Sequence, residues 1–405
     1  MALANGTAFN FKTAQAQGSR VVSVRNSEAG QGRIVVLDGL RGLMTVFVVV
    51  SHFFGEVPNG VRALSVGWIA VLMFFVLSGF LVGRLILEKK DHANFFTVFY
   101  IRRICRTLPV YLFCVVLVFA LMRLVGPAPY MEITREFPLW SYLTFTQNMF
   151  MSETNAFGPY WLAPTWTLSV EEQFYLIAPA LMIFLPARWL MPVLSAGAVL
   201  SVAFRAAIFW GGAMPPLAGL VYLPGCMDAL FCGLMAAVIY KTKDVTRYAM
   251  ILRLATLAML ASVFVMRLAD GTDGHLFEVF SRLIASLGCA AYILSVVTGA
   301  PEGERLRSPV LGFFGETSYA VYLIHLMVLG LMHGLILGTA PDLASPAQWA
   351  VTLAALPVTV FFGWLITKTI EQPISAYGRR FAWSKERRDE AANDYGGAIS
   401  LGAAS

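Results

Sequence analysis

Charged residues are scarce in this sequence. Asp, Glu, Lys and Arg together make up 13% of its 405 residues, about half of the roughly 25% found in soluble globular proteins. Hydrophobic residues make up 58%. A soluble protein cannot cover so much apolar surface with polar groups, and disordered chains lack such a share of apolar residues. The composition therefore excludes both classes and indicates a protein that crosses a membrane several times.

Cysteine and histidine are also rare, with five residues of each type. The cysteines form no CxxC pair and mostly stand inside apolar runs, which argues against a disulfide framework or a zinc site. No HExxH sequence is present, so we expect no metal. The net charge of +6 does not indicate nucleic-acid binding, because the basic residues stand in short segments between apolar stretches.

Ten apolar stretches are long enough to cross a membrane, since a hydrocarbon core of about 30 Å takes about 20 helical residues. Helices are expected throughout, because the stretches lack the alternation of barrel strands. The sequence thus predicts an all-α polytopic transmembrane bundle of about ten spans. The predicted spans are 34–54, 67–87, 108–126, 164–185, 190–210, 223–240, 248–267, 276–298, 310–338 and 348–370.

Basic residues set the expected orientation. The segments on one side of the ten spans, including both chain ends, hold 20 Lys and Arg residues, and those on the other side hold 2. Because cytoplasmic segments carry this excess, both termini are expected in the cytoplasm. We expect a polar N-terminal segment (1–33), a transmembrane domain (34–373) and a charged, then Gly/Ala-rich tail (374–405). Residues 1–33 lack the apolar stretch of a signal peptide, so the first span is expected to remain as an anchor.

Ionisable residues inside a span are costly and are therefore candidates for function. In the first span, LDGLRGLMTVFVVVSHFF, Arg41 and His52 are 11 residues apart. Eleven helical steps exceed three turns by about 20°, so both side chains share a face, about 16 Å apart along the axis. Asp38 precedes Arg41 by one turn and is expected to pair with it. His52 either moves a proton or hydrogen-bonds a neighbouring helix, and both interpretations are open at this point.

Two adjacent glutamates stand in the fourth span, WTLSVEEQFYL. They point about 100° apart and are expected to differ in role. Glu171 shares a helix face with Tyr175, whereas Glu172 shares a face with leucines. Ser169 lies on a third face, which is polar. The alternative to a functional site is a polar contact between helices.

The ninth span contains ETSYAVYLIHLMVL. Ser318, Tyr322 and His325 fall on one of its faces by the i, i+4, i+7 rule. A second histidine inside the membrane is not expected to serve packing alone. Whether His325 is catalytic or holds the fold together is left open.

Three arginines, Arg102, Arg103 and Arg106, lead into the third span in RRICRTLPVY. They either anchor the span at the cytoplasmic surface or bind phosphate, which guanidinium groups hold through two hydrogen bonds. Charge pattern alone favours the first interpretation.

Other polar and small residues inside the spans predict contacts between helices. Asp228 is a further site candidate, and Arg205 and Arg282 are expected partners for carboxylates. Gly79 and Gly83 have the spacing that allows two helices to pack closely.

Together these motifs resemble the acyltransferase-3 family of integral-membrane acyltransferases. The resemblance runs from about Val35 to Pro373 and rests on LDGLRG with His52 downstream. It continues with FFVLSGFL, RRICRTLPVY, WTLSVEEQFYL, MDALFCG, SYAVYLIH and EQP, in that order.

The resemblance implies an enzyme of the cell inner membrane that moves an acyl group from cytoplasmic acyl-CoA to a hydroxyl of an acceptor. The acyl group is usually acetyl, from acetyl-CoA, and the acceptor is often an extracytoplasmic or lipid-linked glycan. Some relatives carry a fused soluble domain; since this chain has no length for one, it is expected to act alone or with a separate periplasmic partner.

Site roles are carried over from the same resemblance, with direct transfer preferred to an acyl-histidine intermediate. The catalytic residues would be His52 as base, Arg41 and Glu171, and the acyl-CoA would be held by Arg103, Arg106 and Arg102. The other candidates are Asp38, Ser169, Glu172, Tyr175, Asp228, Ser318, Tyr322 and His325.

Three competing functions remain at this point. One is a signalling or scaffold protein that keeps the fold without catalysis, against which the presence of both Arg41 and His52 counts. A transporter would also place charges inside spans, although no clear inverted repeat is visible. An acyltransferase acting on a small, macrolide-like molecule would share every motif above, so the sequence does not separate these acceptors.

Overall fold

The computed structural model describes residues 34–126, 128–131, 133–270 and 274–384. All regular elements in these ranges are helices, apart from one isolated bridge between Ile133 and Pro159. With π and 3-10 turns labelled η, they run α2 Val35–Val50, η1 Ser51–Gly55, η2 Arg62–Leu64, α3 Gly67–Lys89, α4 Phe95–Val125, η3 Pro129–Met131, α5 Leu139–Leu143, α6 Gln147–Thr154, η4 Tyr160–Leu162, α7 Thr165–Phe184, α8 Ala187–Phe209, α9 Ala218–Val221, α10 Leu223–Thr242, η5 Thr246–Tyr248, α11 Ala249–Asp270, α12 His275–Val297, α13 Pro301–Leu306, α14 Pro309–Leu337, α15 Pro346–Ile366, η6 Thr367–Glu371 and α16 Gln372–Arg379.

In the described part of the chain, nine helical segments are long and apolar enough to cross a membrane. They match nine of the ten predicted spans and confirm an all-α polytopic bundle. The remaining one, α7, is helical where it was predicted, over 20 residues. It is not among the nine, because Glu171, Glu172 and Gln173 lower its hydropathy. A tenth crossing and the side on which the termini lie stay predictions.

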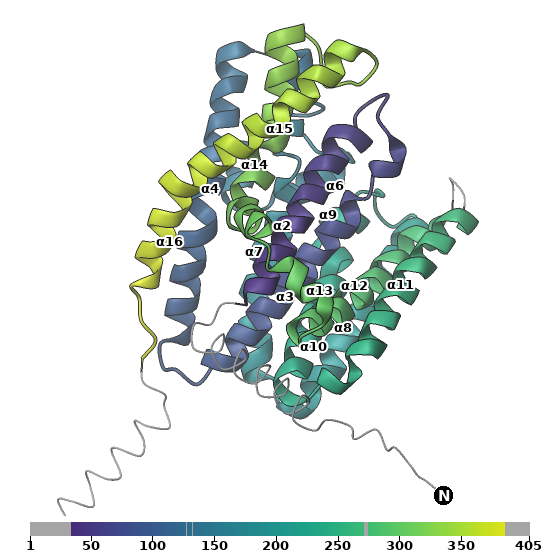
Figure 1. The fold of residues 1–405 in the computed structure, drawn as a ribbon, viewed down its shortest axis with the longest axis vertical. Coiled ribbons are helices and arrows are strands. Elements are labelled where there is room, and N and C mark those ends of the chain that lie inside the picture. The colour runs from purple at the N-terminus through teal and green to yellow at the C-terminus, as the bar shows by residue number, and fades with distance from the viewer. Residues whose placement is uncertain (1–33, 127, 132, 271–273, 385–405) are drawn as a thin grey trace, which may run out of the picture.

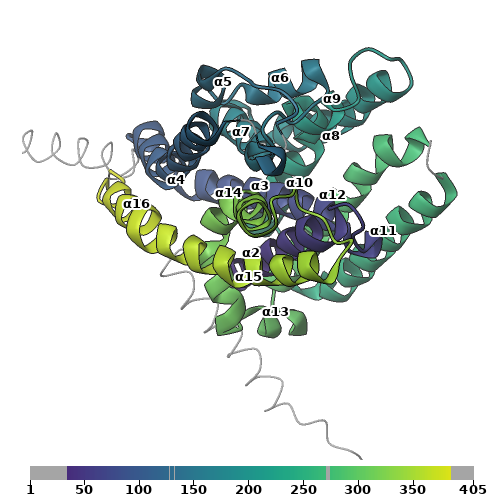
Figure 2. The ribbon, with the colours of Figure 1, turned by 90° about the horizontal axis from the view of Figure 1, so that it is seen from above.

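The bundle has α2 and α3 in its middle (Figure 1). On one side stand α4, α15 and α16, and on the other α8, α10, α11 and α12. Figure 2 shows the same division from above, with α14 beside α2 and α3. The strongest packing joins α3 to α10, α2 to α14, α11 to α12 and α14 to α15. Residues from the first and ninth predicted spans are therefore neighbours.

Glycines explain why α2 and α14 lie so close. A Cβ atom on Gly42 would lie 2.1 Å from the Leu311 carbonyl oxygen, and one on Gly315 would lie 2.0 Å from the Asp38 carbonyl oxygen. Distances this short are not tolerated, so only glycine allows the two backbones to touch. Gly42, the residue after Arg41, thus brings the α14 residues alongside the arginine.

The predicted glycine contact of the second span is also present. A Cβ atom on Gly79 would lie 2.1 Å from the Leu230 carbonyl oxygen, and one on Gly83 would lie 2.9 Å from the Ala237 Cβ atom. Both neighbours belong to α10. The GxxxG spacing therefore serves close packing of α3 on α10.

Helix α4 begins at Phe95, well before the predicted start at 108, so the three arginines of RRICRTLPVY lie on the helix itself. Pro109 does not end the helix. A proline lacks the N–H that would bond the carbonyl four residues earlier, here that of Cys105. The Ser375 hydroxyl of α16 donates to this carbonyl at 3.5 Å. The freed backbone group thus keeps a partner inside the bundle.

The last helix also extends beyond its predicted end. After α15, the chain continues through η6 and α16 to Arg379, and α16 packs along α4 (Figure 1). The predicted segment 1–33 and the tail from residue 385 lie outside the described residues.

Candidate active site

A cavity of about 320 Å³ opens between α2, α3, α4, α7 and α14. Its lining contains four arginines, Arg41, Arg84, Arg103 and Arg106, and two glutamates, Glu88 and Glu171. Apolar side chains, including those of Phe74, Phe75 and Leu81, form much of the remaining wall. Predicted residues from four different spans therefore meet at one cavity.

Two of these arginines have a carboxylate partner on their own helix. The Arg41 Nη1 atom lies 3.3 Å from the Asp38 carboxylate, as the one-turn spacing predicted. The Arg84 Nε atom donates to Glu88 at 2.7 Å. The Arg41 side chain is 17% exposed, so it reaches the cavity from a largely buried position.

Arg103 is held differently. Its guanidinium lies over the Tyr175 ring, 3.6 Å from the centroid, which is a cation–π contact. Its Nε atom is buried and has no hydrogen-bond partner in the described residues. A buried N–H without a partner is costly, and here it belongs to a side chain that lines the cavity.

Glu171 has both carboxylate oxygens occupied. Ser78 donates to Oε1 at 2.6 Å and Tyr175 donates to Oε2 at 3.0 Å. The two hydroxyl groups also lie 3.1 Å apart. Because each oxygen has a donor, the carboxylate is fixed at the cavity wall. The predicted shared face of Glu171 and Tyr175 is confirmed, whereas the contact with Ser78 of α3 had no signal in the sequence.

A second group of polar residues lies at the other end of α2. There α2 passes into the π turn η1, which carries His52. The His52 Nδ1 atom lies 2.8 Å from the His325 Nε2 atom of α14. The histidine pair is the principal feature that the sequence analysis missed, because the two residues are 273 positions apart.

Both histidines have a further partner. The His325 Nδ1 atom lies 2.7 Å from the Tyr322 carbonyl oxygen. On the far side of the pair, the His52 Nε2 atom lies 3.5 Å from the Glu56 carboxylate. Glu56 was not among the predicted site residues. Its i, i+4 spacing from His52 is the signal that would have indicated it.

Tyr322 connects the histidine pair to the cavity. Its side chain lines the cavity, and its hydroxyl lies 3.0 Å from the Thr167 hydroxyl of α7. Its backbone carbonyl, as described above, faces His325. One residue therefore separates the arginine-lined space from the two imidazole rings. Ser318, one turn earlier, also lines the cavity.

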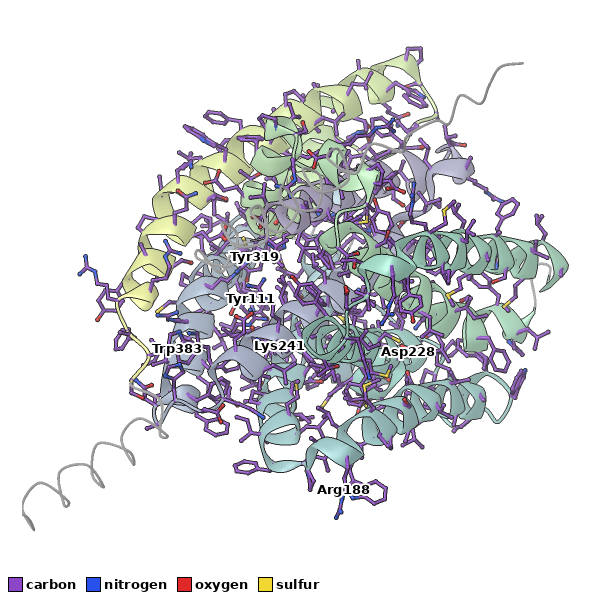
Figure 3. The ribbon with its side chains drawn as sticks, turned by 60° about the horizontal axis from the view of Figure 1, so that its bottom comes forward. Tyr111, Arg188, Asp228, Lys241, Tyr319 and Trp383 are labelled. Atoms are coloured by element: carbon purple, nitrogen blue, oxygen red, sulfur yellow. The ribbon has the colours of Figure 1, made fainter. Side chains whose placement is uncertain are left out.

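Asp228 lies away from this site. It is fully buried with Arg205, whose Nη2 atom donates to it at 2.7 Å, and the same arginine also bonds the Gly225 and Val279 carbonyls. Figure 3 shows Asp228 among α8, α10 and α12, apart from Tyr319 on the cavity wall. This arrangement joins three helices and reaches no cavity residue.

Arg102 also lies outside the cavity. It donates to the Phe381 carbonyl at 2.7 Å and lies 5.0 Å from the Trp383 ring centroid. Asn94 bonds the same segment through the Ala382 carbonyl at 3.0 Å, and Trp383 is visible against α4 in Figure 3. Arg102 thus fastens the segment after α16 to α4.

Two predicted residues of α7 take no part in the cavity lining. Glu172 accepts a hydrogen bond from Thr107 at 3.0 Å. The Ser169 hydroxyl is buried without a partner in the described residues. In the same residues, no group of three or more His, Cys, Asp and Glu side chains is placed to hold a metal ion.

Comparison with known proteins places this sequence in a family. The profile of the acyltransferase-3 family, described as an acyltransferase domain, matches residues 34–368. An acyltransferase of Streptomyces mycarofaciens, MdmB, is 28% identical over 86% of this chain and 93% of its own length. The comparison with solved structures found no significant match.

Two longer relatives are also similar. A putative O-acetyltransferase of Staphylococcus aureus (strain COL) is 24% identical over 84% of this chain. The peptidoglycan O-acetyltransferase OatA of Listeria monocytogenes is 28% identical over 84% of it. The chain spans 57% and 56% of their lengths. Because the family profile covers nearly all the described residues, the chain belongs to the acyltransferase-3 family and is a membrane acyltransferase.

Proposed function

We infer that this enzyme transfers an acyl group, most simply acetyl, from acyl-CoA to a hydroxyl of a glycan or lipid-linked glycan, with His52 as general base. One observation carries the inference. Helix α2 and its π turn present Arg41 to an arginine-lined cavity and His52 to a second histidine. Eleven residues of helix separate the two groups by about 16 Å, which suits a long donor held at one end and reacting at the other.

The cavity has the chemistry that the acyl donor needs. Coenzyme A carries phosphate groups, and Arg41, Arg103 and Arg106 line one cavity. Their guanidinium groups support an anionic ligand at this place, because such groups bind phosphate well. The apolar wall suits the uncharged pantetheine arm. Arg102 is left out of this proposal, since its guanidinium is engaged with the segment after α16.

At the other end, His52 would accept the proton of the acceptor hydroxyl. As the O–H bond breaks, the oxygen attacks the thioester carbonyl, a C–O bond forms and the C–S bond breaks. The leaving thiolate then takes the proton from the imidazolium. Glu56, 3.5 Å from the His52 Nε2 atom, would stabilise that imidazolium. Glu171 would keep the cavity wall in place beside the bound acyl-CoA.

The direction of transfer rests on the predicted orientation. With both termini in the cytoplasm, the arginine end of α2 faces the cytoplasm, where acyl-CoA is present. The histidine end then faces the other side of the inner membrane, where a surface glycan is accessible.

The acceptor class has some support from relatives. The name of the Listeria relative specifies peptidoglycan, which favours a glycan. The Streptomyces relative, matched over 93% of its length, is named as an acyltransferase without an acceptor, so a small, macrolide-like acceptor stays the second candidate. A transporter is no longer considered, because the chain belongs to a family of acyltransferases.

The test is acyl transfer from radiolabelled acetyl-CoA in membranes that contain wild type or His52→Ala. Label is followed into lipid, glycan and small-molecule fractions after addition of an envelope-glycan extract. His275→Ala is the control, because His275 is exposed and lies outside the site. We expect label with wild type and the control, and none with His52→Ala. Full transfer by His52→Ala would refute His52 as the base, and label in the small-molecule fraction alone would favour the second acceptor.

A further inference from the structure

The histidine pair determines more than the identity of a base. The two ring centroids are 4.9 Å apart and the ring planes differ by 25°. The nitrogens that face each other, Nδ1 of His52 and Nε2 of His325, are separated by 2.8 Å. Ring N–H groups and nitrogen lone pairs lie in the ring plane, so nearly coplanar rings at this distance share an N–H···N hydrogen bond. One nitrogen must donate and the other must accept.

The Tyr322 carbonyl decides which nitrogen donates. A carbonyl oxygen can only accept, so the His325 Nδ1 atom, 2.7 Å away, carries a hydrogen. A neutral imidazole has one N–H; the His325 Nε2 atom therefore accepts. It follows that the His52 Nδ1 atom carries the hydrogen. In the neutral pair, the free lone pair of His52 is on Nε2.

The surroundings keep this arrangement in place. His325 is 0% exposed, so water cannot replace its partners. Its helix packs on α2, with backbone contacts at Gly42 and Gly315, ten residues before each histidine, and the Tyr322 carbonyl belongs to the same helix as His325. The tautomer is therefore set by main-chain geometry and not by a mobile side chain.

The free nitrogen of His52 faces a fixed carboxylate. Glu56 lies 3.5 Å from Nε2 through Oε2, a distance at which no hydrogen bond joins the two groups, so Nε2 needs no hydrogen in the neutral pair. Its Oε1 atom accepts a hydrogen bond from Ser51 at 2.7 Å, and the Ser51 oxygen in turn accepts from the Gly67 N–H at 3.0 Å. The Glu56 side chain is 39% exposed. The base atom and a partly exposed anion thus border the same space.

We propose that His325 is a positioning residue that, through the Tyr322 carbonyl, fixes His52 in the Nδ1–H tautomer, so that Nε2 is the base and the acceptor hydroxyl enters on the Glu56 side. This rests on the proposed function. The hydroxyl proton passes to Nε2 as the C–O bond forms and the C–S bond breaks, and it leaves Nε2 for the thiolate. The Nδ1 hydrogen stays between the rings, where the His325 lone pair stabilises the imidazolium.

The first experiment compares two replacements of His325. The side-chain oxygen of Gln reaches about as far as Nε2 and can accept from His52, whereas Leu cannot. We expect His325→Leu to lower kcat about 100-fold or more, the contribution of a correctly placed base, with the KM for acetyl-CoA little changed. We expect His325→Gln to stay within about tenfold of wild type, the cost of one weakened hydrogen bond. Equal activity of the two variants, high or low, would overturn the proposal.

The second experiment measures the tautomer itself. In detergent-solubilised enzyme labelled with ¹⁵N-histidine, the ring nitrogen shifts of neutral His52 report which nitrogen carries hydrogen. His52→Ala identifies its signals, and His275→Ala controls for the substitution. We expect Nδ1–H in wild type and His325→Gln, and a change toward Nε2–H in folded His325→Leu. Nε2–H in wild type would overturn the proposal. This measurement of the tautomer needs no turnover. If the proposed acyl transfer proved wrong, the tautomer of His52 could still be determined, so a failure of the proposed function and a failure of this proposal are distinguishable.

Discussion

Arg102 and Arg103 are neighbours on α4 but face different parts of the molecule. Arg103 lies over the Tyr175 ring at the cavity wall, whereas Arg102 donates to the Phe381 carbonyl beyond α16. Successive residues of a helix point about 100° apart, so one basic cluster in the sequence serves two purposes. Only Arg103, with Arg106 and Arg41, remains in the proposed donor site.

The two arginines are therefore expected to differ on substitution. Arg103→Ala removes a charged hydrogen-bond donor from the cavity and should raise the KM for acetyl-CoA about tenfold to 100-fold. Arg102→Ala should leave that KM unchanged and lower the melting temperature, because the segment after α16 loses its anchor. Donor-dependent kinetics and thermal unfolding in detergent check both. A higher KM in Arg102→Ala alone would show that the assignment is reversed.

The buried pair of Arg205 and Asp228 predicts a loss of stability without a specific loss of catalysis. Asp228→Ala leaves the Arg205 charge buried without its carboxylate, which costs about 3–5 kcal/mol. We expect less folded protein in the membrane, with activity per folded molecule close to wild type. The double variant Arg205→Leu/Asp228→Leu should regain part of the folded yield, since it removes both charges. A folded but inactive Asp228→Ala enzyme would instead place Asp228 in catalysis.

Two glycines of α14 offer a matched test of the α2–α14 contact. A Cβ atom on Gly315 would lie 2.0 Å from the Asp38 carbonyl oxygen, whereas one on Gly312 would have nothing within 4 Å. Gly315→Ala should separate the helices and reduce both stability and turnover. Gly312→Ala should be neutral, or stabilise by up to about 1 kcal/mol, as alanine does in a helix interior. Equal melting temperatures of the two variants would contradict the close approach.

The loop after His52 predicts a pH effect outside the membrane-spanning segments. The Asn59 amide donates to Asp342 at 2.9 Å, and this hydrogen bond holds the pKa of the Asp342 carboxyl below its usual value. Because the pKa is lower in the folded state, the contact contributes stability at pH values above the unfolded pKa of about 4. This contribution is lost as the pH falls through the folded pKa. The same two loops are also joined by the Leu343 N–H, which donates to the Pro58 carbonyl at 3.2 Å.

Hydrogen exchange of residues 339–345 measures this tether. Protection should fall as the pH is lowered below about 4 in wild type, after correction for the intrinsic exchange rate. Asn59→Leu should show reduced protection already at neutral pH, and Asn155→Leu, in another loop, serves as control. Unchanged protection in Asn59→Leu would show that the loops are held by other contacts.

Hydropathy and helical periodicity predicted much of this molecule. The helical positions of the spans follow from their apolar length, and the shared face of Glu171 and Tyr175 follows from the i, i+4 rule, as does the pairing of Asp38 with Arg41. Each of these depends on residues within one helix. The family resemblance supplied the expected roles of His52 and the arginines, which the structure does not test.

Contacts between helices were not predictable in the same way. Periodicity tells which residues share a face but not which face of another helix covers it, so the pairing of His52 with His325 and the bond from Ser78 to Glu171 were missed. The start of α4 was missed for a different reason. The predicted span covered only the apolar stretch that follows the arginines, whereas the helix itself already begins at Phe95.

The backbone contact between α2 and α14 has a practical consequence. Detergents and lipids act mainly on the outward-facing side chains of a bundle, whereas these two helices meet through glycine backbones in its interior. We therefore expect the spacing of the two imidazole rings to survive extraction from the bilayer. Measurements on purified enzyme then describe the same arrangement of the two histidines as those made in the native membrane.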